Sequence, residues 1–63
     1  MKRMSSRELI KAVEKAGWVK NRTNGSHHIF THPTKPGALS IVHPEKDVPT
    51  GTLRATLKKA GLL

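Results

Sequence analysis

The sequence contains no cysteine and few aromatic residues, and both absences limit how its fold can be held together. Without cysteine the chain has no disulfide framework and no thiolate metal site, so a hydrophobic core must stabilise it. Trp18 and Phe30 are the only aromatic residues. A chain of this length buries only about 60% of the surface that its unfolded state exposes. We therefore expect one small domain, residues 1–63, with two layers at most and modest stability.

Long hydrophobic runs are also missing, and with them the signatures of secretion and membrane insertion. The positively charged start, residues 1–8, is not followed by the apolar run of about 7 to 15 residues that a secretory signal requires. No segment approaches the roughly 20 apolar residues that span a bilayer. The sequence therefore predicts a soluble cytoplasmic protein with no membrane partner.

Negatively charged residues are also few. Twelve Lys and Arg residues stand against four Asp and Glu, which gives a formal net charge of +8. This imbalance exceeds what solubility needs, and the basic residues are spread along the chain instead of forming a tail. Such a pattern indicates a folded basic surface, for which nucleic acid is the expected partner.

A first helix is indicated by a capping signal and an apolar stripe. Ser5 and Glu8 have the spacing of a capping box, in which each side chain accepts a hydrogen bond from the other residue's backbone amide. Leu9 and Val13 then follow at helical spacing. Gly17 is a suitable C-terminal cap.

The middle of the chain has the pattern of three strands. Asn24-Gly25 lies between two extended runs, 18–23 and 26–32, which is the strongest short-range signal for a hairpin. Pro33–Gly37 has the composition of a turn, and residues 38–43 have that of a third strand pairing back on the second.

A second helix completes the expected fold. Thr50 is a candidate N-cap, Leu53, Leu57 and Ala60 follow at helical spacing, and Gly61 ends the pattern. The predicted class is therefore α+β, in the order α-β-β-β-α. Two amphipathic helices would cover one face of a three-stranded antiparallel sheet and leave the other face in water.

Alternation along the central strand leaves two orientations open. Residues 27, 29 and 31 share one face and residues 26, 28, 30 and 32 share the other, so each face carries one large apolar side chain. We expect Phe30 to point inward, which places His27 on the open face. If Ile29 pointed inward instead, His28 and His32 would take that place.

Four histidines in the central region are the candidates for chemistry, and a metal site is the first use to consider. His28 and His32 are four residues apart on one strand, which separates their side chains by about 13 Å, too far for one ion. Only a pairing across strands with His43 could bring two imidazoles together. We therefore expect no metal ion and no cofactor.

A serine nucleophile is also disfavoured, because adjacent strand residues point apart and Ser26 has no nearby base and acid pair. Its hydroxyl is expected to bond the hairpin turn instead. Gly25 supplies the positive φ that this turn requires, and its bare backbone would let a phosphate approach.

His27 follows this turn in a basic chain whose expected partner carries its own nucleophile. In RNA the 2′-hydroxyl attacks the adjacent phosphate once a base removes its proton, and imidazole has a suitable pKa near neutrality. Nearby cations can stabilise the charge that develops on the phosphate. The hypothesis is a catalytic His27, with Gly25, Ser26, Lys20 and Arg22 as substrate-binding residues.

Motifs along nearly the whole chain together resemble the HicA family of toxins. They are Ser6–Ile10, Gly17-Trp18, Gly25–Phe30 (GSHHIF), His32-Pro33, His43-Pro44, Asp47–Leu53 and Lys59–Leu62. The resemblance implies a double-stranded-RNA-binding-domain-like fold and a ribosome-independent mRNA interferase that arrests growth. The family's catalytic histidine follows Gly-Ser and maps onto His27, and its glycine maps onto Gly25. The resemblance also implies a HicB-type antitoxin that covers the histidine.

Two other functions remain to be compared with RNA cleavage. A non-catalytic RNA-binding module could use the same fold and charge, with the histidines as bystanders, and cleavage of a purified transcript separates the two. A DNA-binding protein is disfavoured, because helix-turn-helix spacing is absent and the last helix is needed for the core.

Overall fold

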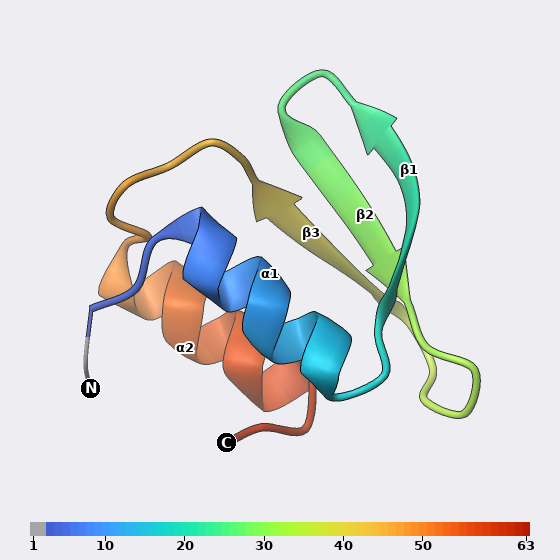
Figure 1. Ribbon diagram of the computed structural model, residues 1–63. Helices are drawn as coiled ribbons and strands as arrows, with labels where there is room; N and C mark the ends of the chain where they lie inside the picture. The colour runs from blue at the N-terminus through green and yellow to red at the C-terminus, as the bar shows by residue number, and fades with distance from the viewer. Residues whose placement is uncertain (1–2) are drawn as a thin grey trace.

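The computed structural model describes residues 3–63, so the first two residues of the expected domain lie outside the described part. Within that part the elements are, in order, α1 (Ser6–Lys15), β1 (Val19–Asn24), β2 (His27–Thr31), β3 (Ala38–Val42) and α2 (Thr50–Lys59). The three strands form one antiparallel sheet in the order β1-β2-β3. Both helices lie on the same side of this sheet (Figure 1). The predicted element order and layering are confirmed.

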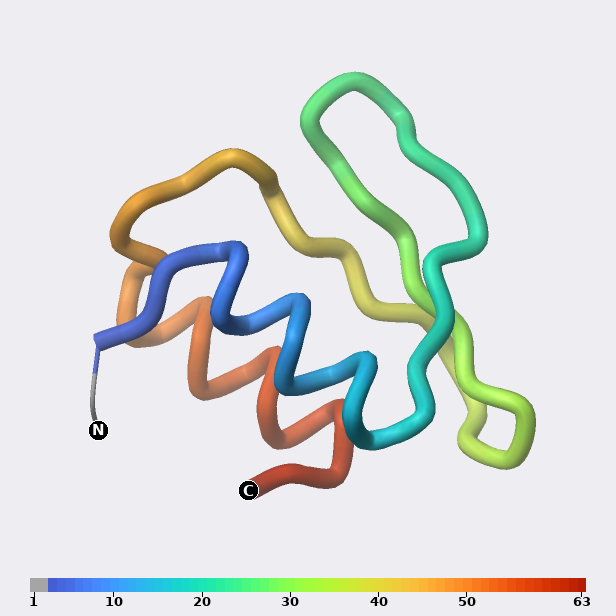
Figure 2. The backbone as a smooth tube through the Cα atoms, viewed as in Figure 1, coloured from blue at the N-terminus to red at the C-terminus, as the bar shows by residue number. Residues whose placement is uncertain are grey.

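The chain trace shows where the two ends of the sheet lie relative to the helices. In Figure 2 the two helices run in the same direction, and the hairpin of β1 and β2 extends beyond them. The tip of that hairpin therefore stands clear of the helical layer.

Neither helix in the described part of the chain has the length and apolarity that crossing a membrane requires.

The caps of α1 are those that the sequence predicts. The Ser5 hydroxyl accepts a hydrogen bond from the Glu8 amide at 3.2 Å, and the Glu8 carboxylate accepts one from the Ser5 amide at 3.0 Å. Gly17 follows the C-cap Ala16 with φ of +99°, a conformation that glycine adopts without steric cost.

Two local predictions need correction. The N-cap of α2 is Pro49, not Thr50, because the Pro49 carbonyl already accepts the first helical bond, from Leu53 at 2.8 Å. The hairpin turn also sits one residue later than expected. Asn24 pairs with His27 at the end of the ladder, so Gly25 and Ser26 are the central residues of the turn. Gly25 takes the first of these positions with φ of +63°, where hairpins often need glycine.

Phe30 is fully buried at the centre of β2, which confirms its inward orientation. It lies opposite Lys20 on β1 and Leu39 on β3. Since alternate residues of a strand point to opposite faces, His27 and Ile29 belong to the open face, as predicted.

The core lies between the sheet and the two helices. Its buried side chains come from every element except β1, together with Trp18, Val48 and Ala60. Trp18 also donates a hydrogen bond from Nε1 to the Ala60 carbonyl at 3.2 Å, which satisfies its polar atom inside the core. This bond ties the end of α2 to the start of the sheet.

Replacing Phe30 with Ala should lower the free energy of unfolding by about 3–5 kcal/mol, since the change leaves a cavity at the centre of a small core. Ile29→Ala is the matched control, because the adjacent side chain lies half-buried on the open face. Its loss should be about 1 kcal/mol. Urea titration followed by circular dichroism measures both values, and equal losses would contradict the assignment of faces.

Candidate functional site

His27 is the first residue of β2 and lies exposed on the open face of the sheet. Its ring is held from the neighbouring strand: Nδ1 lies 3.3 Å from the hydroxyl oxygen of Ser40 on β3. Ser40 is a diagonal neighbour, since Val42 is the residue directly opposite His27. Among the described residues no hydrogen bond involves His27 Nε2, and the side chain is exposed to solvent.

The turn before His27 presents its backbone to solvent. A Cβ added to Gly25 would have no atom within 4 Å, so nothing in the described chain covers this position. Ser26 anchors the turn through its backbone, because its carbonyl accepts a hydrogen bond from the His43 amide at 2.9 Å. The expected hydroxyl bond from Ser26 to the turn is not found among the described residues.

The two basic candidates of β1 lie on different faces. Arg22 is directly opposite Ile29 and Lys20 is directly opposite Phe30, with a bulge between the two positions. Directly opposed residues share a face, so Arg22 borders His27 and Lys20 lies on the side of His28. The bulge has no clear signal in the sequence, where alternation alone would place Lys20 and Arg22 on one face.

Both ring nitrogens of His32 make hydrogen bonds within the domain. Nδ1 accepts hydrogen bonds from the amides of Thr34 and Lys35 at 3.0 and 3.2 Å, so Nε2 carries the proton and donates to the Ala16 carbonyl at 3.1 Å. The ring also lies edge-on to Trp18, with centroids 5.2 Å apart. His32 therefore has a structural role.

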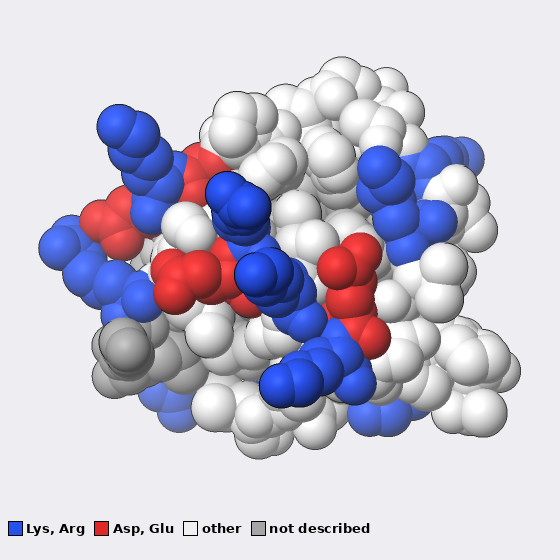
Figure 3. All heavy atoms as spheres, in the orientation of Figure 1, with Lys and Arg blue, Asp and Glu red and all other residues white. Residues whose placement is uncertain are grey.

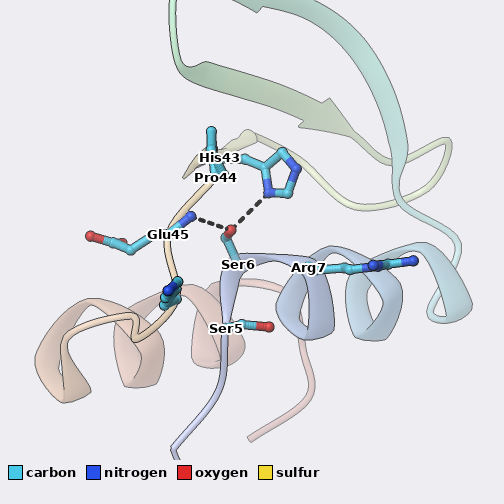
Figure 4. Close-up of a pocket in the computed structure, with 7 residues that line it drawn as sticks. Ser5, Ser6, Arg7, His43, Pro44 and Glu45 are labelled. Carbon is cyan, nitrogen blue, oxygen red and sulfur yellow. Dashed lines mark hydrogen bonds between the residues drawn. The ribbon is translucent and has the colours of Figure 1, made fainter.

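His43 is engaged on the helical side of the sheet. Its Nδ1 lies 2.7 Å from the hydroxyl oxygen of Ser6, which is buried and also accepts a hydrogen bond from the Glu45 amide at 2.8 Å (Figure 4). These residues line an open cavity of about 640 Å³, together with Ser5, Arg7, Pro44 and Lys46. His27 does not line this cavity, so the cavity is separate from the candidate site.

His28 lies beside His43 and next to positive charge. The two rings are edge-on, with centroids 5.1 Å apart. Partial removal from water, Lys20 and His43 together hold the pKa of His28 below its ordinary value of 6.5. The cross-strand approach of His28 and His43 was foreseen as the one arrangement that could favour a metal. Within residues 3–63, however, no group of three or more His, Cys, Asp or Glu residues is placed to hold one.

Sequence reasoning missed Ser40 and Ser6, the two hydroxyls that contact histidines. Ser40 belongs to no motif, and Ser6 was noted only as the start of the motif Ser6–Ile10. Each reaches its histidine only through tertiary structure: Ser40 across the sheet, Ser6 from α1 to the residue after β3. A sequence carries no signal for such contacts beyond the presence of a serine.

Comparisons with known proteins agree with this architecture. A family model described as HicA toxin of bacterial toxin–antitoxin matches residues 6–62. A chain of a solved structure, a toxin–antitoxin complex from Streptococcus pneumoniae, superposes with a TM-score of 0.79 and 32% sequence identity, covering 94% of this chain and 98% of that one. A search of curated proteins found no match. The fold is that of this toxin–antitoxin neighbour and is double-stranded-RNA-binding-domain-like.

The position of Lys20 can be tested through the titration of His28. Lys20→Gln should raise the pKa of His28 toward its ordinary value, because a positive charge that disfavours the imidazolium is removed. Arg22→Gln is the control of equal charge and should leave that pKa where it is. NMR titration of the ring protons measures both. A response to Arg22→Gln alone would show that the faces of β1 are reversed.

Proposed function

The chain belongs to the HicA family of bacterial toxins, and on this premise we propose that it is an mRNA interferase. It is the toxin of a type II toxin–antitoxin system. The proposed activity is metal-independent endoribonuclease cleavage of mRNA by a single catalytic histidine, His27. The proposed setting is the cytoplasm, with residues 1–63 acting as one domain and a HicB-type antitoxin as inhibitor.

Of the four histidines, only His27 is exposed and lies on the open face, and this observation carries the proposal. His32 and His43 use their rings to hold the fold, and His28 shares the inner face with Phe30. His27 instead offers one ring nitrogen to solvent while Ser40 holds the other. This is the arrangement that a general base needs, because one contact fixes the ring and the other nitrogen receives the proton.

The proposed reaction is a transesterification within the RNA. His27 Nε2 takes the proton of a 2′-hydroxyl, and the 2′-oxygen bonds to the adjacent phosphorus. The bond from phosphorus to the 5′-oxygen of the next nucleotide breaks, and that oxygen takes a proton from water or from the imidazolium. The products are a 2′,3′-cyclic phosphate and a 5′-hydroxyl end, so no metal ion or cofactor is consumed.

The substrate-binding residues act around this point. Arg22 borders His27 on the open face, where its charge can stabilise the negative oxygens of the phosphate in the transition state. Gly25 and Ser26 leave room for the phosphate at the turn. Lys20 lies on the other side of the hairpin and adds positive charge there. RNA in single- or double-stranded form is the proposed substrate class.

A HicB-type antitoxin fits the same face. A protein of net charge +8 attracts an acidic surface, and covering His27 is the simplest way to block proton transfer. The open face also exposes the apolar side chain of Val19, with an accessible fraction of 61%, which a protein partner could bury.

His27→Ala should abolish RNA cleavage and toxicity without unfolding the domain. Removing an essential proton-transfer group costs about 10²- to 10⁴-fold in rate, whereas an exposed substitution changes stability by less than about 0.5 kcal/mol. Cleavage of a purified transcript and thermal unfolding by circular dichroism separate the two effects.

His28→Ala is the matched control, since the adjacent side chain points to the other face. It should retain cleavage. A His27→Ala variant that cuts at the parental rate, or that fails only because it is unfolded, would contradict the catalytic assignment. An inactive His28→Ala with active His27→Ala would move the chemistry to the inner face. Binding without cleavage by the parent would favour the non-catalytic RNA-binding alternative.

Cleavage should persist in EDTA, because the proposed base and charge-stabilising groups are all side chains of this chain. The measurement is the initial rate on a transcript with and without chelator. Loss of the rate in EDTA and its recovery with one divalent cation would falsify the metal-independent mechanism.

A further inference from the structure

The acidic residues of this chain are confined to one part of the molecule. Glu8 and Glu14 lie on α1, and Glu45 and Asp47 lie in the loop before α2. Residues 18–44 and 48–63 contain no acid. Their basic residues are Lys20, Arg22, Lys35, Arg54, Lys58 and Lys59. In Figure 3 the acidic side chains lie among basic ones over α1 and the loop before α2, while the hairpin side of this view shows basic residues without acidic ones.

Two lysines of the acid-free part, Lys35 and Lys59, approach each other's elements where the turn between β2 and β3 meets the end of α2, and Lys58 is in the same last helical turn as Lys59. Lys35 donates a hydrogen bond from Nζ to the Ala60 carbonyl at 3.2 Å and lies against Gly61. Lys59 packs on the same turn from the helix, since its Cε lies 3.5 Å from where a Cβ of Gly37 would be. Lys58 precedes Lys59 in α2 and is exposed. We refer to Lys35, Lys58 and Lys59 as the lysine cluster.

The end of a helix attracts cations, but it does not account for the whole cluster. The dipole of α2 places partial negative charge at the C-terminal end of the helix, which favours nearby lysines. Lys35 already occupies the Ala60 carbonyl, however, and Lys58 and Lys59 add two like charges beside it. Because the chain supplies no acid in this part, a negative partner that binds several cations at once would reduce their repulsion.

The lysine cluster and the candidate site lie at opposite ends of β2. His27 begins the strand and Thr31 ends it, about 13 Å along the chain, and the turn that carries Lys35 follows. The open face between them has Ile29, Thr31 and Ser40 and no acid. Lys35 and Lys59 reach the end of α2 on the helical side of the sheet. A strand of RNA with its reacting phosphate at His27 would therefore follow β2 and pass around the turn between β2 and β3 to reach the cluster, and residues 18–44 along this path include no acid.

We propose that the lysine cluster anchors the phosphate backbone of the RNA substrate to one side of the cleaved bond. This inference rests on the proposed function and names a second contact region for the same substrate. The contacts are to phosphates, so they position the RNA and do not select its sequence. The helix α1, where basic side chains are interspersed with acidic ones, is left outside the RNA path.

The test measures binding of a single-stranded RNA on the order of a dozen nucleotides, a length that spans a site of this size. The parent carries His27→Ala so that the RNA stays intact, and binding is followed by fluorescence anisotropy over a series of salt concentrations. The cluster variant carries Lys35→Gln, Lys58→Gln and Lys59→Gln. The matched control carries Arg7→Gln, Lys11→Gln and Lys15→Gln on α1, which removes the same total charge.

The cluster variant should bind at least about tenfold more weakly, and its salt dependence should fall by about two units of slope, because three phosphate contacts are lost. The α1 control should lose far less, and its slope should stay close to that of the parent. Equal losses in the two variants would overturn the proposal, since they would reflect net charge alone. So would a cluster variant that binds like the parent.

Failure of the inference and failure of the proposed function give different results. A parent that binds no RNA would remove the proposed function itself. A parent that binds, with the loss falling on the α1 control, would keep the function and move the RNA path to α1. Thermal unfolding checks both variants. If the loss of the Lys35 bond to Ala60 unfolds the triple variant, the double variant Lys58→Gln, Lys59→Gln gives the same comparison against Lys11→Gln, Lys15→Gln.

Discussion

The burial of Phe30 is the constraint on which the rest of the structure depends. Phe30 occupies the centre of the middle strand and is completely removed from water, in a core with only one other aromatic side chain. Because side chains alternate along a strand, this burial fixes the face of every residue of β2. It turns His27 outward and His28 inward. A change of one residue in register would exchange them, so the placement of the proposed base follows from hydrophobic packing.

His43 and the buried Ser6 connect α1 to the hairpin turn before His27. Ser6 begins α1 and joins His43 and Glu45, so the loop after β3 is held to the first helix. The amide of His43 in turn holds the carbonyl of Ser26, which lies next to His27 in the hairpin turn. The turn extends beyond the helical layer, and this chain of hydrogen bonds keeps it in a defined position.

Acidic and basic residues are distributed unevenly over the surface. The acids gather on α1 and the loop before α2, where the ion pair of Arg3 and Asp47 at 2.9 Å also lies. That pair is largely exposed to solvent and contributes little to stability. All the charged residues of the sheet and of α2 are basic. In the proposed function, a polyanionic substrate and an acidic antitoxin are drawn to the same basic region, which is an electrostatic basis for competition between them.

The sequence by itself determined the order of elements and the caps of α1, because these depend on local spacing: a capping box, a glycine with positive φ, and apolar residues at helical periods. It placed the hairpin turn one residue too early, so the register of β1 and β2 was left to the structure. It also identified His27 and Gly25 as candidates, since their motif is contiguous. Tertiary structure alone decided which face of β2 is buried, because Phe30 and Ile29 offered equal apolar signals. It alone separated Lys20 from Arg22 through a bulge, and brought Ser40 to His27 and Lys35 to Ala60. Those contacts join residues distant in the chain, and their positions follow from packing of the whole domain, which no local pattern encodes.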